Sequence, residues 1–230
     1  IKSVVFGGLD GILTSFAIVA GAAGAGLGVK AVLAIGISNV LADALAMGVG
    51  EYLSSKSERD YVREEHARET WEFENHPSGE ISEMVEIFTS RGMAADDARE
   101  VTERMAKYPE FFVNLMMTEE LGLQAPDDDD NTVLKGGVMF GSFATFGMLP
   151  VLGYVITAWV LRNAEDGGSE TTMLIVACVV TGITLLGLGA FKAHFAHKRY
   201  LRSALETLVL GGACASLSYS VGLALSSISL

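Results

Sequence analysis

The amino-acid sequence predicts an all-α membrane protein with five transmembrane helices and an acidic helical domain inserted between the second and third of them. Five segments are apolar and long enough for this, because a helix needs about 20 residues to cross a bilayer. The segment 54–132 differs in kind, because it holds 21 acidic residues and only 8 basic ones. Its net charge of −13 accounts for the −12 of the whole 230-residue chain. The apolar segments are 4–28, 31–53, 136–161, 171–191 and 207–230.

We therefore divide the chain into three parts: 1–53 with the first two spans, 54–132 as the acidic domain, and 133–230 with the last three spans. The first span contains one acid and the second contains two, whereas the last three contain no charged residue. The acids inside the membrane thus belong to the first two spans.

The orientation follows from the charge of the short loops. Five spans put the two ends of the chain on opposite sides of the membrane. The loop 192–202, between the fourth and fifth spans, carries Lys192, Lys198, Arg199 and Arg202. Short basic loops stay in the cytoplasm, and the acidic domain lies on the same side as this loop. We therefore expect a cytoplasmic N-terminus and acidic domain, and a C-terminus on the other side.

One face of the second span carries a row of polar side chains. Residues four apart share a face of a helix, so Asn39, Asp43, Met47 and Glu51 form one stripe, about 18 Å long at 1.5 Å per residue. In the first span, Asp10 lies among glycines and hydroxyl side chains. A carboxylate in hydrocarbon costs roughly 2.5 kcal/mol or more, so acids inside a membrane usually line a cavity or an ion path.

These residues predict a path for a metal ion, because a thioether beside carboxylates favours a transition metal over Mg²⁺ or Ca²⁺. The candidate path residues are Asp10, Asp43, Met47 and Glu51. Simpler interpretations remain open. Asp10 and Asp43 could make structural hydrogen bonds, Glu51 could lie at the membrane surface, and Met47 could pack against a neighbour.

The acidic domain contains two pairs of glutamates with helical spacing. No Gly or Pro interrupts the helix expected from residue 54 until Pro77. A turn at 73–79 should fold the next helix back on it, which would bring Glu69 and Glu72 close to Glu80 and Glu83. Further along, "MMTEE" supplies Met116, Met117, Glu119 and Glu120. Carboxylates and thioethers together suit Fe²⁺ better than Ca²⁺, although glutamates on a helix can also form an ordinary solvated face.

Several classes of function lack their motifs in this sequence. It has no calcium-binding EF-hand loop and no phosphate-binding loop for ATP. None of its four histidines follows a glutamate by three residues, as a di-iron oxidase of the ferritin type would need. The acidic charge argues against nucleic acid as a partner and favours cations. Cys178 and Cys214 lie within spans and are interpreted as small apolar residues.

Glycine is concentrated in the membrane segments, since only three of the 26 glycines lie in the acidic domain. Small residues let membrane helices approach each other closely. Gly7 and Gly11 form such a pair, and Gly21, Gly24 and Gly26 crowd the end of the first span. We expect either tight helix packing, which could include a dimer interface, or positions that simply tolerate lipid.

Two long strings resemble the vacuolar iron transporter family. "FGGLDGILTSFAIVAGAAGAG", residues 6–26, is similar to the first span of that family. "ADALAMGVGEYLSSKSERD", residues 42–60, is similar to its second span and the start of its cytoplasmic domain. The acidic insert resembles the metal-binding domain of plant-type members, so that the resemblance covers nearly the whole chain.

The resemblance implies a homodimeric carrier in the vacuolar membrane, with a lumenal C-terminus, that moves Fe²⁺ out of the cytosol in exchange for protons. It implies no permanently bound cofactor, with Fe²⁺ as substrate and Mn²⁺, Co²⁺ and Zn²⁺ as further candidates. The path would lie at the dimer interface and would be lined by Asp10, Asp43, Met47 and Glu51. Between Glu119 and Glu120 the resemblance favours Glu120. The implied cytoplasmic ligands are Glu69, Glu72, Glu80, Glu83, Met116, Met117 and Glu120.

Two other functions compete with transport. A membrane-anchored protein that binds or senses metal, without moving it, would need the acidic domain but no membrane path. A membrane oxidase could use the carboxylates, and the missing Glu-x-x-His pattern counts against it.

Overall fold

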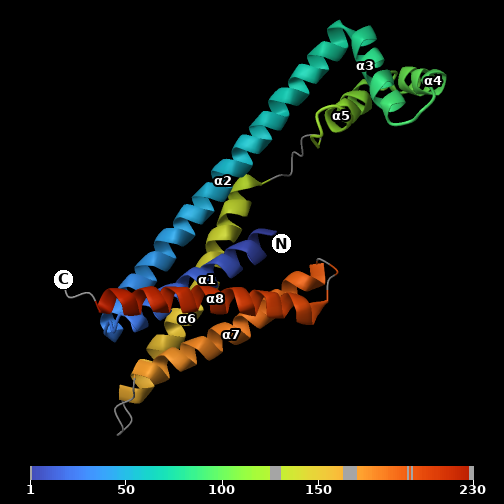
Figure 1. Cartoon of the computed structure of the whole chain (residues 1–230). Helices are drawn as coiled ribbons and strands as arrows, with labels where there is room; N and C mark the ends of the chain where they lie inside the picture. The colour runs from blue at the N-terminus through green and yellow to red at the C-terminus, as the bar shows by residue number, and fades with distance from the viewer. Residues whose placement is uncertain (1, 125–130, 163–169, 196, 198, 228–230) are drawn as a thin grey trace. The chain divides into compact units, whose positions relative to one another are not determined.

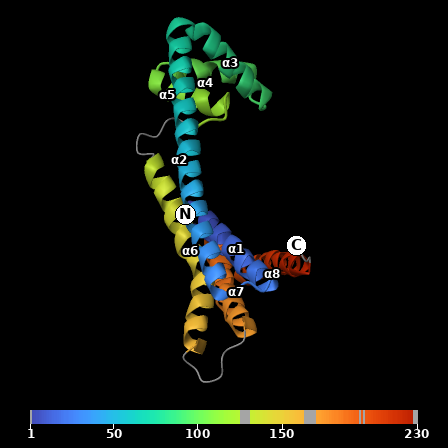
Figure 2. The same cartoon turned by 90° about the vertical axis from the view of Figure 1, so that its left-hand side faces the viewer.

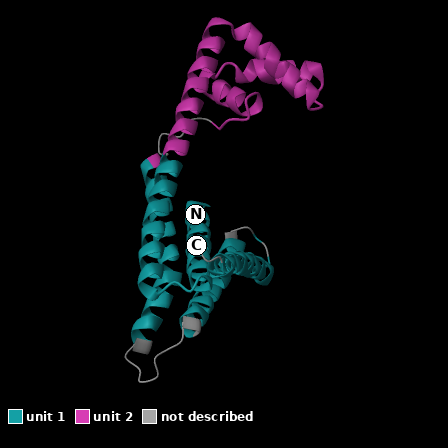
Figure 3. Cartoon of the chain, turned by 60° about the vertical axis from the view of Figure 1, so that its left-hand side comes forward, with its two compact units in different colours: residues 1–52, 133–230 teal, residues 53–132 magenta. Residues whose placement is uncertain are grey.

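The computed structural model describes residues 2–124, 131–162, 170–195, 197 and 199–227. Within these residues the chain is helical and contains no strand. It divides into two compact units (Figure 3): unit 1 comprises Ile1–Tyr52 and Val133–Leu230, and unit 2 comprises Leu53–Thr132. Five of the helices are long and apolar enough to cross a membrane, which confirms the all-α membrane fold predicted from the sequence.

The five long helices are α1, α2, α6, α7 and α8 (Figure 1). Their bounds are Lys2–Gly24, Val29–Asn75, Thr132–Arg162, Glu170–Phe195 and Tyr200–Ser226. Helix α2 runs without a break across the boundary of the units, because no Gly or Pro follows Gly50 until Pro77. Within unit 1, α1 lies among α6, α7 and α8 in both views (Figures 1 and 2).

The last span begins earlier than the sequence predicted. Helix α8 starts at Tyr200 and α7 continues to Phe195, so the connection is shorter than the predicted loop 192–202. Lys192 and Arg202 therefore lie in helices. The long stems of Lys and Arg let their charges reach the membrane surface from within a helix, and a charged residue near a helix end therefore does not stop the helix.

The glycines of α1 are sites of close helix packing inside one chain. A Cβ added to Gly11 would lie 2.6 Å from the backbone O of Phe143 on α6. Hydroxyl side chains tie the same surfaces together, because Ser142 on α6 donates to the O of Val4 at 2.6 Å and Ser218 on α8 donates to the O of Ala17 at 2.6 Å. Of the two readings for the glycines, tight packing holds at Gly11, and the partner there is α6 of the same chain.

Unit 2 has a small hydrophobic core of its own. The end of α2 packs with α3 (Pro77–Ser90), α4 (Ala95–Met105) and α5 (Pro109–Glu119). The core residues are Phe73, Met84, Phe112, Val113 and Met116. Only His76 separates α2 from α3, so the turn is tighter than the predicted 73–79. Pro77 explains this, because its ring fixes φ for a first helical position and its missing N–H needs no partner there.

Candidate metal centre and membrane carboxylates

Three glutamates from three different segments of unit 2 converge on one point. Glu69 lies on α2, Glu80 lies in the first turn of α3, and Glu120 directly follows α5. Each offers one carboxylate oxygen, and these oxygens lie within 4.8 Å of one another. The tight turn at His76 brings the first two together, and the core contact between Phe73 and Phe112, with ring centroids 5.0 Å apart, holds α5 against α2.

Glu69 is the most buried member of this cluster, with 1 % of its surface exposed. Its Oε1 accepts a hydrogen bond from Arg68 at 3.3 Å. Its Oε2 is buried and has no hydrogen-bond donor among the described residues. Burying a charged oxygen without a partner is costly, and a bound cation would remove that cost. The three glutamates could therefore hold a metal ion, with the Oε2 of Glu69 as one of the ligand atoms.

The carboxylates also hold protons more tightly than isolated glutamates do. Burial, followed by the nearby charge of Glu83, raises the pKa of Glu80 to about 7. Burial likewise raises the pKa of Glu69 and of Glu120, although the hydrogen bond from Arg68 opposes the shift at Glu69. A divalent cation would displace these protons, because metal ligands must be deprotonated. Protons and a divalent cation would therefore compete for these carboxylates near neutral pH.

The other predicted ligands of unit 2 lie around this cluster in different settings. Glu72 is half-buried and lies 3.9 Å from the Nε of Arg68, whereas Glu83 is exposed. Met116 and Met117 are fully buried on α5. Met116 packs in the hydrophobic core, so packing alone explains its burial. Coordination by Glu72, Glu83 and the two thioethers stays a prediction.

The structure separates Glu119 from Glu120. Arg91, which follows α3, forms an ion pair with the carboxylate of Glu119 and also donates to its backbone O at 3.0 Å. This pair ties the end of α5 to the end of α3. The carboxylate of Glu119 is therefore paired with Arg91, and Glu120 is the neighbour whose carboxylate lies in the cluster.

Arg68 is a member of the site that the sequence analysis did not single out. Its guanidinium lies 2.6 Å from Glu65, 3.3 Å from Glu69 and 3.9 Å from Glu72. It supplies positive charge beside a cluster of acids while leaving one oxygen of Glu69 free. Its spacing of three and four residues from Glu65 and Glu72 is the signal that could have identified it.

The membrane carboxylates of unit 1 are arranged differently. On α2, Asn39 donates to the Oδ2 of Asp43 at 2.6 Å, so the predicted stripe is present on one helix face. Ser3 of α1 donates to the Oε1 of Glu51 at 3.2 Å. Asp10 of α1 is half-buried and close enough to Asp43 for their charges to interact. These acids therefore face a shared region between α1 and α2.

The four predicted path residues, Asp10, Asp43, Met47 and Glu51, are all half-buried in the single chain. None is sealed in the core and none points fully outward. The hydrogen bond from Asn39 supports a structural part for Asp43, which was one of the simpler interpretations, and it still leaves the second oxygen of that carboxylate available.

The fold and the two groups of carboxylates describe one class of protein. It is a helical membrane protein with a cluster of glutamates in unit 2 and further acids within its spans. The model of the VIT family matches residues 1–223, and the chain belongs to that family. It is 45 % identical over 224 residues to a protein of Toxoplasma gondii named vacuolar iron transporter, covering 96 % of this chain and 73 % of that one.

Two further relatives carry related names. A vacuolar iron transporter of Plasmodium falciparum is 39 % identical, with 98 % of this chain and 82 % of the relative covered. Vacuolar iron transporter 1 of Arabidopsis thaliana is 30 % identical, with 95 % and 83 % covered. The similarity therefore extends over both units and includes a plant protein.

Proposed function

We propose that this protein is a secondary transporter that moves Fe²⁺ from the cytosol into the vacuole, or a similar compartment, in exchange for protons. The names of its relatives support iron as the cargo, and membership of a transporter family supports transport rather than catalysis. Mn²⁺, Co²⁺ and Zn²⁺ are further candidate cargoes, because carboxylates and thioethers suit several divalent transition metals.

The observation that carries the proposal is the cluster of three carboxylates in which Glu69 and Glu80 are buried and Glu120 is exposed. Glu69 has an oxygen without a partner among the described residues, and the pKa of Glu80 is raised to about 7. Such a cluster captures a cation at neutral pH and releases it when protons are supplied. We assign it the part of a collector for cytosolic metal.

The membrane acids provide the proposed path. Metal would pass along Glu51, Met47 and Asp43 on α2, with Asp10 of α1 beside Asp43. Because a carboxylate holds either a metal or a proton, a proton gradient of the opposite direction would drive metal release. The basic residues at the α7–α8 end of unit 1 support a cytoplasmic location for that end.

A second copy of the chain would complete this path. Directly beside the polar stripe of α2 runs a row of small residues: Ser38, Ala42, Ala46 and Gly50. All four are exposed in the single chain, and a Cβ added to Gly50 would meet nothing within 4 Å. Small residues allow close helix contact in membranes, so this face of α2 fits a homodimer interface that would enclose the half-buried acids.

Uptake of Fe²⁺ by proteoliposomes with an imposed pH gradient tests the proposal directly. We expect gradient-dependent uptake by the wild type, its loss in Asp10→Ala, and normal uptake in Asp96→Asn, which removes an exposed acid of α4. Uptake that ignores the gradient would contradict proton exchange. Full uptake by Asp10→Ala would contradict the path.

A metal sensor without transport is the second candidate, because the three converging glutamates all lie inside unit 2. A unit with its own core and its own metal centre could act without a membrane path. This alternative predicts metal binding by the full chain, lost in Glu69→Gln, together with no metal flux under any gradient.

A further inference from the structure

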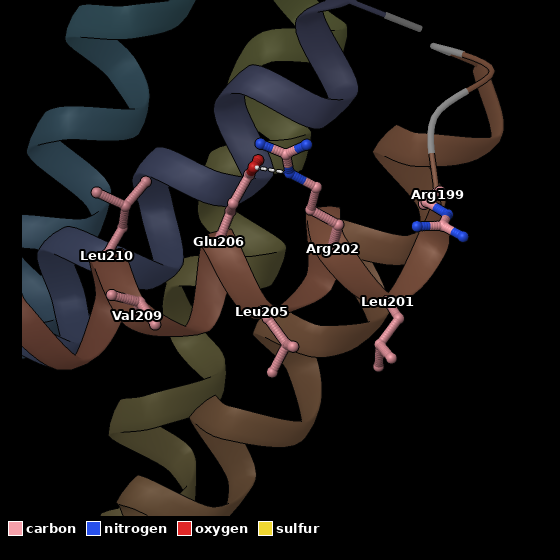
Figure 4. Close-up of a pocket in the computed structure, with 7 residues that line it drawn as sticks. All are labelled: Arg199, Leu201, Arg202, Leu205, Glu206, Val209 and Leu210. Atoms are coloured by element: carbon pink, nitrogen blue, oxygen red, sulfur yellow. Dashed lines mark hydrogen bonds and ion pairs between the residues drawn. The ribbon is translucent and has the colours of Figure 1, made fainter.

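The first turns of α8 carry a face that no described helix of unit 1 covers. This face forms an open groove of about 930 Å³ (Figure 4). Its lining residues include Arg199, Leu201, Arg202, Leu205, Glu206 and Val209. The opposite face of α8 is packed, since Ser203, Ala204 and Thr207 are buried and a Cβ on Gly189 of α7 would touch Ala204. The groove is therefore the free side of an otherwise anchored helix.

Polar and apolar residues share this face of α8. Arg199 and Arg202 lie at its beginning, and Leu205 and Val209 follow along the helix toward its middle (Figure 4). Leu201 is 73 % exposed and Val209 is 68 % exposed. The first turn of this face thus holds both arginines together with Leu201, and the next turns hold Leu205 and Val209 beside Glu206.

Tyr200 is the first residue of α8, and it contacts the last turn of α7. Its hydroxyl lies 2.9 Å from the Nδ1 of His194, and the two rings stack with centroids 6.3 Å apart. Tyrosine is enriched at the boundary between lipid headgroups and acyl chains. Lys192 and His194 both lie in the last turn of α7. We therefore place Arg199 and Arg202 near the lipid headgroups and Leu205 and Val209 deeper.

We propose that this groove binds an anionic phospholipid of the surrounding bilayer. Its phosphate would lie between Arg199 and Arg202, because guanidinium groups bind phosphate through paired hydrogen bonds. One acyl chain would lie along Leu201, Leu205 and Val209. Basic pockets at the cytoplasmic ends of membrane helices are suited to acidic lipid headgroups. Two arginines near the start of α8 and exposed apolar side chains on the same face match an acidic lipid better than a soluble anion.

Glu206 tunes this site. Its Oε1 accepts from the Nε of Arg202 at 3.2 Å, an ion pair in which the Arg202 side chain stays 82 % exposed. The pair leaves the terminal nitrogens of the guanidinium for phosphate. It also places a negative charge beside the headgroup, so removal of this charge should strengthen lipid binding.

The test measures lipid binding by the full chain, purified and stripped of lipid in a neutral detergent. Phosphatidylserine and phosphatidylcholine with identical acyl chains serve as probes, and retained lipid is counted by native mass spectrometry. We expect phosphatidylserine to bind about tenfold more tightly than phosphatidylcholine. The variant Arg199→Gln/Arg202→Gln should lose this preference, Arg199→Lys/Arg202→Lys should keep most of it, and Glu206→Gln should bind phosphatidylserine more tightly.

A matched control separates this site from general charge. Lys2→Gln/Lys30→Gln removes the same number of charges from two exposed lysines of α1 and α2, and it should leave the preference unchanged.

Equal binding of the two lipids, or an unaltered preference in the Arg-to-Gln variant, would overturn the proposal. So would glycerophosphoserine binding as tightly as the whole lipid, which would make the apolar residues irrelevant. A change of oligomeric mass in the Arg-to-Gln variant, without a change in lipid binding, would show that a second copy covers the groove instead. None of these outcomes depends on whether the protein transports iron.

Discussion

The two units use carboxylates in different ways. In unit 2, Glu69 and Glu80 are buried and converge with Glu120, and one oxygen of Glu69 has no partner among the described residues. In unit 1, Asp43 and Glu51 already accept hydrogen bonds from Asn39 and Ser3. The first arrangement leaves one buried carboxylate oxygen without a partner among the described residues. In the second arrangement each acid accepts one hydrogen bond from an uncharged side chain and stays half-buried.

This difference suggests a division of work. Acids that lie close together bind a cation strongly, because the cation relieves their mutual repulsion. A row of half-buried acids with one neutral hydrogen bond each binds more weakly, so that an ion can move on. The difference fits the proposed roles, in which the acids of unit 2 collect the metal and those of unit 1 form the path.

The largest expected effect comes from removing a membrane acid. Asp10→Ala should abolish gradient-dependent Fe²⁺ uptake by proteoliposomes, because the path loses one of its proposed ligands beside Asp43. Metal binding at equilibrium by the same variant should be nearly that of the wild type, since unit 2 keeps its cluster. If Asp10→Ala lowered both Fe²⁺ uptake and equilibrium metal binding, the proposed difference between the two units would be wrong.

The reverse experiment removes the most buried acid of unit 2. Glu69→Gln keeps the shape of the side chain and removes the charge, so we expect metal affinity to fall about tenfold to a hundredfold. Isothermal titration of the full chain with Fe²⁺ under anaerobic conditions measures this change. Glu119→Gln is the matched control, because that side chain is bound to Arg91 instead of facing the cluster. A larger loss in Glu119→Gln than in Glu69→Gln would show that the cluster is wrongly assigned.

Much of this comparison could be predicted from the sequence, because the features concerned depend on residues that lie close together in the chain. Span length and apolar composition are local properties, so the five membrane helices were predicted correctly. Glu69 and Glu80 were expected to meet because a single turn connects their helices. The position of Glu120 came from the family resemblance, and the structure brings it to the same cluster.

The remaining features depend on residues far apart in the chain. The choice between Glu119 and Glu120 rests on Arg91, which lies 28 residues away. The partners of the α1 glycines lie on α6 and α8, so spacing alone could not tell packing within the chain from packing between chains. The free oxygen of Glu69 depends on which of its two oxygens Arg68 occupies, and this is a matter of side-chain geometry that no sequence pattern encodes.

The dependence of metal binding on pH gives a third test of the cluster in unit 2. The pKa of Glu80 is raised to about 7, so this carboxyl is mostly protonated below pH 7 and mostly ionised above it. Protons compete with metal for the ionised form, and apparent affinity should therefore fall about tenfold between pH 8 and pH 6. Titration of the full chain across this range measures the change.

The variant Glu80→Gln isolates the contribution of this one group. It should bind metal more weakly than the wild type at pH 8, and its affinity should vary less between pH 8 and pH 6. The shifts at Glu69 and Glu120 have the same direction, so some dependence should remain. A wild-type affinity that stays constant over this range would contradict exchange of protons for metal at the cluster.

The smallest expected effect concerns the open side of the membrane path. A Cβ on Gly50 would meet nothing within 4 Å in the single chain, so Gly50→Leu should fold normally. If a second copy packs on this face of α2, the larger side chain should weaken the dimer several-fold, because overpacking a close helix contact costs about 1–3 kcal/mol. Gly137→Leu places the same side chain in open space on α6 and should leave the dimer intact. Sedimentation in detergent over a range of protein concentrations compares the two variants, and equal dimer fractions would mean that something other than a second copy covers the half-buried acids of unit 1.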